Sequence, residues 1–180
     1  MANSGTLTAA QQTAVKADIL ANGDLNAIPN TLDGAFAIAA LYNLDAVPDY
    51  FVWRTTVPIA EVQNAIELDD VADITAADSD RVIKLLDIRS SGIIAERDTD
   101  RLAFEDVFSS ATGDNSQDAL AAIWYRKATR IEKVLALGAN PGTEPAIGAG
   151  DRDVSATAGP DTLGFEGPIS FTEVFNARNS

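Results

Sequence analysis

The chain contains no cysteine and no histidine among its 180 residues. Without cysteine there is neither a disulfide framework nor a thiolate nucleophile. Without histidine, the most common general base and the most common transition-metal ligand are missing. There is no Gly-rich phosphate loop, and nothing sets the separation of acidic residues such as Glu61, Glu67 and Asp69 as a paired-carboxylate hydrolase requires. We therefore expect a protein that is not an enzyme and carries no cofactor.

Long apolar runs and basic residues are also lacking. No segment approaches the roughly 20 apolar residues of a membrane span, and the start MANSGTLTAA lacks the charged-then-apolar order of a signal peptide. Lys and Arg number 13 against 27 Asp and Glu, which gives a net charge of −14. A protein that wraps nucleic acid needs a basic footprint, so this balance argues against that class. We expect a protein with no membrane partner that is used in the cytoplasm or in something assembled there.

What the chain does contain is a series of helix signals, and 46% of its residues are hydrophobic, enough for a core. Thr8 and Gln11 form a capping box, and Asn22-Gly23 ends the helix that it starts. The very apolar segment 35–43, AFAIAALYN, is expected to be buried core rather than a binding surface. Further helices are predicted near 58–67, 80–91 and 98–111.

The longest uninterrupted helical pattern covers 115–138. Asn115 is a good N-cap, Gly138 supplies a left-handed C-cap, and no Pro or Gly lies between them. Its apolar stripe is wider than one face, which predicts burial on more than one side. We expect a central helical strut whose Ile131 and Leu135 lie in the core.

Basic side chains interrupt the apolar pattern of this helix. Arg126, Arg130 and Lys133 lie near one face of it. In so acidic a protein they are candidates to bind a partner, by pairing with acidic groups of an adjacent subunit. Intrachain pairing on a solvated face is the alternative.

Two further stretches have more than one interpretation. The acidic run 67–80 has carboxylates spaced as in a calcium loop, but the central Gly and the final Glu of an EF-hand are not in register. A solvated acidic face is the preferred interpretation, and a cation site stays open.

The aromatic cluster 50–53 is interpreted as a hydrophobic wedge that locks the second and third helices together, with a stacking platform for bases or sugars as the alternative.

The composition changes after Gly138. Residues 139–162 are rich in Gly and Pro and are predicted to form a linker, after which apolar residues return in 163–180. Chains rarely end in exposed phenylalanines, so this segment either folds back or docks on a partner. We expect docking, and the side chains assigned to it are Phe165, Ile169, Phe171, Val174 and Phe175.

The predicted fold is therefore all-α. About six helices form a compact bundle over 1–138, with the long helix at its C-terminal end. An extended linker over 139–162 and a docking arm over 163–180 follow.

Four segments carry a resemblance to a known family. They are, in chain order, DILANGDLNAIPNTLDGAFAIAALYN, DYFVWRTTV, RKATRIEKVLALG and GFEGPISFTEVFNARN. They resemble small proteins of tailed-bacteriophage genomes found among head and tail morphogenesis proteins, while 67–115 matches least. Such proteins are similar to helical head-completion adaptors, which form a twelve-membered ring beneath the portal and attach to it with terminal arms.

The resemblance implies a structural virion protein at the head-to-tail junction. Its partners would be the portal protein, a downstream neck or tail protein and further copies of itself, and DNA would pass through the ring without sequence-specific binding. Another neck protein or a tail terminator is the nearest alternative. A small acidic regulatory binding protein, with the basic helix as its contact site, is the alternative from a different class.

Overall fold

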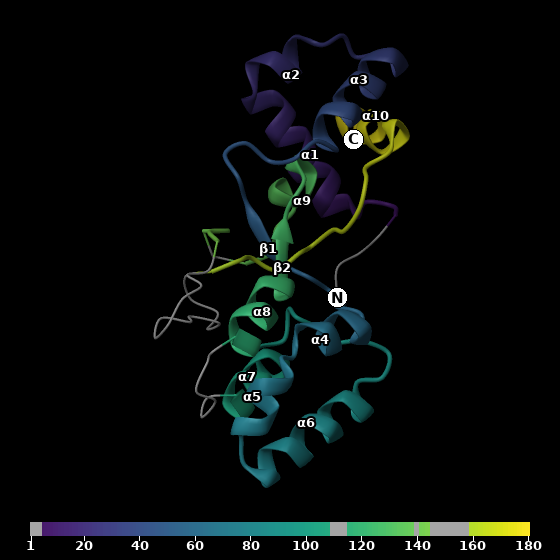
Figure 1. Ribbon diagram of the computed structural model, residues 1–180. Helices are drawn as coiled ribbons and strands as arrows, with labels where there is room; N and C mark the ends of the chain where they lie inside the picture. The colour runs from purple at the N-terminus through teal and green to yellow at the C-terminus, as the bar shows by residue number, and fades with distance from the viewer. Residues whose placement is uncertain (1–4, 109–114, 139–140, 145–158) are drawn as a thin grey trace. The chain divides into compact units, whose positions relative to one another are not determined.

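The computed structural model describes residues 5–108, 115–138, 141–144 and 159–180 (Figure 1). These residues are mostly helical, as predicted, and they also form one small sheet that was not predicted. The helices are α1 (Ala9–Ala21), α2 (Gly23–Ala27), α3 (Leu32–Tyr42), α4 (Ile59–Ala65), α5 (Leu68–Asp73), α6 (Ala76–Ile88), α7 (Asp98–Phe108), α8 (Asn115–Trp124), α9 (Arg130–Val134) and α10 (Phe171–Asn179). The two strands, β1 (Phe51–Trp53) and β2 (Tyr125–Lys127), pair with each other.

The chain divides into two compact units, each built from separate stretches of sequence. The first unit draws on Met1–Tyr50, Lys127–Ala139 and Asp161–Ser180, and the second on Phe51–Arg126 and Asn140–Pro160. This division differs from the expected one, in which 1–138 formed a single body. Of the described residues that follow α9, 141–144 belong to the second unit and 161–180 to the first.

The continuous helix expected over 115–138 is wrong. α8 ends at Trp124, the chain runs extended through β2, and α9 begins after Thr129. Thr129 and Glu132 form a capping box, in which the Glu132 carboxylate accepts the Thr129 N–H at 2.9 Å. A helix start inside the pattern therefore separates two shorter helices. Ile131 and Leu135 are nevertheless buried, as expected of the strut.

The first unit has its core between α1, α3, α9 and α10. The end of the chain returns alongside α9, where the Leu137 N–H donates to Thr162 O at 2.9 Å. Gly164 permits this close approach, because a Cβ there would lie 2.3 Å from Leu135 O. Figure 1 shows α10 beside α3. The core side chains are Leu7, Val15, Ile19, Leu25, Ala35, Ile38, Ala39, Tyr42, Ile131, Leu135, Phe165, Ile169, Val174 and Ala177.

Three capping boxes tie the separate stretches of this unit together. In each box the third helical residue caps its own helix with one polar atom and reaches a distant stretch with the other. The long-range bonds join Gln11 Nε2 to Gly164 O (2.9 Å), Glu132 Oε1 to Gly167 N (3.1 Å) and Glu173 Oε1 to Leu7 N (2.8 Å).

The second unit packs around its two tryptophans. Trp53 and Trp124 are buried with the inner faces of α4, α7 and α8, and the buried Arg101 guanidinium stacks 3.7 Å from the Trp53 ring centroid. Burial lowers the pKa of Arg101 to about 10. Trp53 is thus a core residue of the second unit, whereas Tyr50 of the same aromatic cluster belongs to the first, so the cluster is not a single wedge between two helices.

Candidate protein-docking surface

α3 has apolar side chains on both sides, and only one side is covered. Ala35, Ile38 and Tyr42 are buried in the core of the first unit. On the opposite side Phe36 has 65% of its surface exposed. We call the exposed apolar set the α3 face: Leu32, Phe36, Ala37, Ala40, Leu41 and Leu44. The expectation that segment 35–43 is buried core is therefore wrong for four of its nine residues.

The sequence of α3 explains why an apolar surface can remain exposed. The helix begins at Thr31, whose hydroxyl accepts the Gly34 N–H, and within it Asp33 is the only charged residue. Since every turn carries apolar residues, the hydrophobic pattern does not specify which side turns inward. The packing of α1, α9 and α10 selects the side that contains Ile38.

A groove borders the α3 face where α3 meets α10. It has a volume of about 230 Å³ and is lined mainly by apolar atoms of Phe36, Ala39, Ala40, Ile169 and Phe171. The Phe36 and Phe171 ring centroids are 5.8 Å apart. Asn43 fixes the chain at the groove, because its side chain exchanges two hydrogen bonds with the backbone of Ile169 (2.8 and 3.0 Å). We call this feature the α3–α10 groove.

A larger pocket lies on the other side of the α3 face and contains two of the predicted basic residues. It has a volume of about 540 Å³ and lies between α1, α3, the 44–47 loop and α9. Its apolar walls include Leu41, Leu44 and Val47, and its charged groups are Asp18, Asp45, Arg130 and Lys133. We call this feature the α9 pocket.

Arg130 pairs within the chain. Its guanidinium lies 3.4 Å from the Asp18 carboxylate, with about a third of each side chain exposed, and 5.3 Å from the centroid of the Tyr42 ring. Burial and the hydrogen bond that Tyr42 donates to Asp18 (2.8 Å) raise the pKa of Tyr42 well above its usual range. The intrachain alternative stated for the basic residues thus applies to Arg130.

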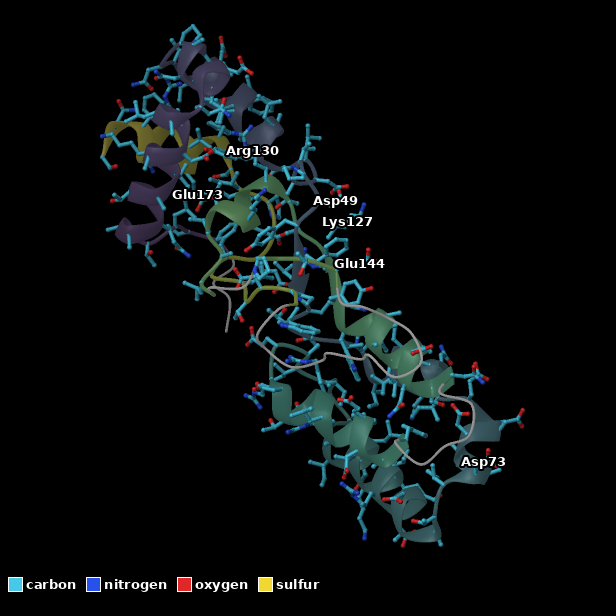
Figure 2. The ribbon with its side chains drawn as sticks, turned by 90° about the vertical axis from the view of Figure 1, so that its left-hand side faces the viewer. Asp49, Asp73, Lys127, Arg130, Glu144 and Glu173 are labelled. Atoms are coloured by element: carbon cyan, nitrogen blue, oxygen red, sulfur yellow. The ribbon has the colours of Figure 1, made fainter. Side chains whose placement is uncertain are left out.

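Lys133 and Arg126 differ from Arg130 in their surroundings. The Lys133 Nζ lies 5.4 Å from the centroid of the Tyr50 ring and makes no ion pair with any residue that the structure describes. Arg126 lies in β2 and not on α9, so the common helical face expected for the three basic residues does not exist. Nearby, Lys127 forms an exposed ion pair with Asp49 at 2.6 Å, shown side by side in Figure 2.

The structure places the C-terminal side chains inside the first unit. Phe165, Ile169 and Val174 are fully buried there, and Phe175 packs against the same core. Burial in this core contradicts the expected docking on a partner for Phe165, Ile169 and Val174. Among the five assigned side chains, Phe171 alone is exposed, and it lines the α3–α10 groove.

The acidic run 67–80 is only partly the solvated face that was predicted. Asp69 and Asp73 are exposed, whereas Asp70 has 2% of its surface exposed and its carboxylate accepts the Ser116 N–H at 2.6 Å. Asp70 thereby satisfies a backbone donor at the start of α8. Across the described ranges, no three acidic residues lie close enough together to hold a metal ion.

Glu61 and Glu67, which were considered for a paired-carboxylate site, each take part in a separate local contact. Glu61 binds Arg54 through two hydrogen bonds (2.5 and 3.1 Å), and this contact lowers the pKa of Glu61. The Glu67 N–H donates to Ser116 Oγ at 2.8 Å, which places Glu67 at the start of α5.

Within the described helices, none is long and apolar enough to cross a membrane.

Sequence reasoning missed the α3 face as a surface, although a signal for it was present. A helix that is apolar on all sides must be buried on all sides or be covered by another molecule. Comparisons with protein families, with curated proteins and with solved structures found no match for the chain.

Proposed function

We propose that the protein is a structural component of a bacteriophage particle, a head-to-tail adaptor that assembles as a ring beneath the portal. The observation that carries the proposal is the exposed α3 face with its adjoining α3–α10 groove. Contiguous exposed apolar side chains are unusual on a protein that acts alone, and they mark surfaces that another protein covers. An adaptor requires such a surface on a stable helical body.

The α3 face takes the anchoring role that was assigned to the C-terminal arm. Phe165, Ile169 and Val174 of the arm are buried in the core of the first unit and are not available to a partner. Phe36 and Phe171 instead offer two neighbouring aromatic rings beside a groove, the kind of feature that receives apolar anchor residues at protein interfaces. The proposed occupant is an apolar segment of the portal protein.

The overall charge is compatible with a ring through which DNA passes. At −14 per chain, a ring of copies is strongly anionic and does not hold phosphate. A neck protein or tail terminator at the same junction would use the same surfaces. The particle experiment below separates these positions from a regulatory binding protein, which would not enter the particle at all.

The test is co-purification of the tagged chain with portal-bearing phage heads. Wild-type protein is expected to attach to heads, and Phe36→Ser is expected to weaken attachment about tenfold or more while the melting temperature stays unchanged, because the side chain is largely exposed. Ile83→Ser is the matched control, since Ile83 on α6 has similar exposure and lies in the other unit.

Two outcomes would overturn the proposal. Wild-type protein absent from heads and from complete particles would remove the virion role. Phe36→Ser attaching as well as wild type and Ile83→Ser would remove the α3 face as the anchoring surface.

A further inference from the structure

We infer that the α9 pocket receives helix α5 of a second copy of this chain, so that copies associate head to tail. The inference rests on the proposed ring function and identifies the two surfaces that join neighbouring subunits. Each copy carries both surfaces, the pocket in the first unit and α5 in the second.

The pocket offers a cation that pairs with no acidic residue in the described part of the chain. Lys133 makes no ion pair with any residue that the structure describes, and its contact with the Tyr50 ring holds the amine at the pocket wall. Arg130 and Asp18 neutralise each other beside it at 3.4 Å. Lys133 can therefore bind a carboxylate of another copy. Such a positive group is scarce in this chain, which has 27 acidic and 13 basic residues.

The outer side of α5 has the complementary chemistry. Leu68 is 83% exposed, and the exposed carboxylates of Asp69 and Asp73 lie on the same short helix. Figure 2 marks Asp73 on α5 and Arg130 on α9. Neither Asp69 nor Asp73 has a side-chain hydrogen bond or ion pair within the described part of the chain. Helix α5 thus presents one large apolar side chain flanked by uncommitted negative charges.

The two surfaces match in both apolar and charged character. The pocket walls Leu41, Leu44 and Val47 are themselves exposed and offer an apolar contact for Leu68, and Lys133 offers a positive charge for the carboxylates of Asp69 and Asp73. Contact between two different surfaces is heterologous, so each bound copy leaves one pocket and one α5 open for the next copy. This arrangement builds a ring when the rotation between neighbours closes.

The test is a charge exchange followed by sedimentation equilibrium over a range of concentrations. Wild-type chain is expected to associate above its 18.9 kDa monomer mass. Lys133→Glu and Asp73→Lys should each weaken association about tenfold or more, because each places like charges opposite one another. The double variant restores an attractive pair in reversed order and should recover association to within about threefold of wild type.

Control variants make the same charge changes elsewhere. Lys84→Glu and Asp87→Lys alter exposed positions on α6 and are expected to leave association unchanged. Since Lys133→Glu also removes the contact with Tyr50, circular dichroism checks its fold, and Asp73→Lys on the exposed side of α5 tests the same contact independently.

The inference would be overturned if the wild-type chain remained monomeric at its highest soluble concentration, or if the single variants associated as strongly as wild type. It would also be overturned if the loss of association in the double variant equalled the sum of the losses in the two single variants. The failure of this inference and the failure of the proposed function can be told apart. If the chain attaches to heads but its self-association does not depend on these charges, only the pocket–α5 contact is refuted. If the self-association depends on the charges but the chain is absent from particles, only the virion function is refuted.

Discussion

Replacing Glu132 should destabilise the first unit more than replacing an exposed carboxylate on a helix does. Glu132 is 1% exposed, and its two oxygens accept the Thr129 N–H at 2.9 Å and the Gly167 N–H at 3.1 Å. The first bond starts α9 and the second holds the returning C-terminal stretch. Removal of the carboxylate leaves two partly buried backbone donors without this acceptor.

The magnitude follows from these two bonds. Hydrogen bonds to a charged acceptor contribute about 1.5–3 kcal/mol each, so the loss of both in Glu132→Ala should lower the free energy of unfolding by about 3–6 kcal/mol. Glu132→Gln retains one oxygen acceptor and should lose about half as much. Against a typical total of about 5–15 kcal/mol, the alanine variant would be only marginally folded.

Urea unfolding at neutral pH measures the effect with two signals. Far-UV circular dichroism reports both units, whereas tryptophan fluorescence reports the second unit, because Trp53 and Trp124 both lie there. The Glu132→Ala transition should move to lower urea by about 1–3 M in circular dichroism and by less in fluorescence.

Asp87→Ala is the matched control, since it removes the same charge from an exposed helical position. If Glu132→Ala were no more destabilising than this control, the bridging role of the carboxylate would be refuted. A loss confined to the fluorescence signal would place the effect in the wrong unit.

Two further predictions concern the first unit. Phe165→Ala should lower the free energy of unfolding by about 3–5 kcal/mol, because the ring is fully buried; an unchanged urea midpoint would mean that the C-terminal stretch is not part of the core. The pKa of Tyr42 and of Tyr50 is raised from the ordinary 10.0, chiefly by burial and then by hydrogen bonds to Asp18 and Asp161. The native state therefore holds these protons more tightly than the unfolded state, so stability should be fully present below pH 10 and should fall as the pH rises above it. Absorbance at 295 nm should show Tyr42 and Tyr50 ionising only as the chain unfolds, and titration of both near pH 10 in the folded protein would contradict the burial argument.

Local signals allowed several elements to be predicted correctly. Thr8 with Gln11 starts α1, as predicted, and contacts of the same length, Thr75 with Asp78 and Ser170 with Glu173, start α6 and α10. These contacts span three residues, so the sequence alone contains both partners. The capping box of Thr129 is equally local, but it lies inside a longer helical pattern, and the continuous apolar periodicity outweighed it.

The sequence by itself determined that the protein is mostly helical, acidic and without cysteine or histidine, because composition and short-range capping require no knowledge of the fold. The tertiary structure decided where residues 159–180 pack and which side of α3 faces solvent. Both depend on contacts between residues more than a hundred positions apart, such as that of Leu7 with Glu173. Phe165 is equally hydrophobic in an arm and in a core, so only the space left between α1, α3 and α9 determines that it is buried. The same packing covers Ile38 and leaves Phe36 exposed, which makes one side of an apolar helix a core element and the other a candidate docking surface.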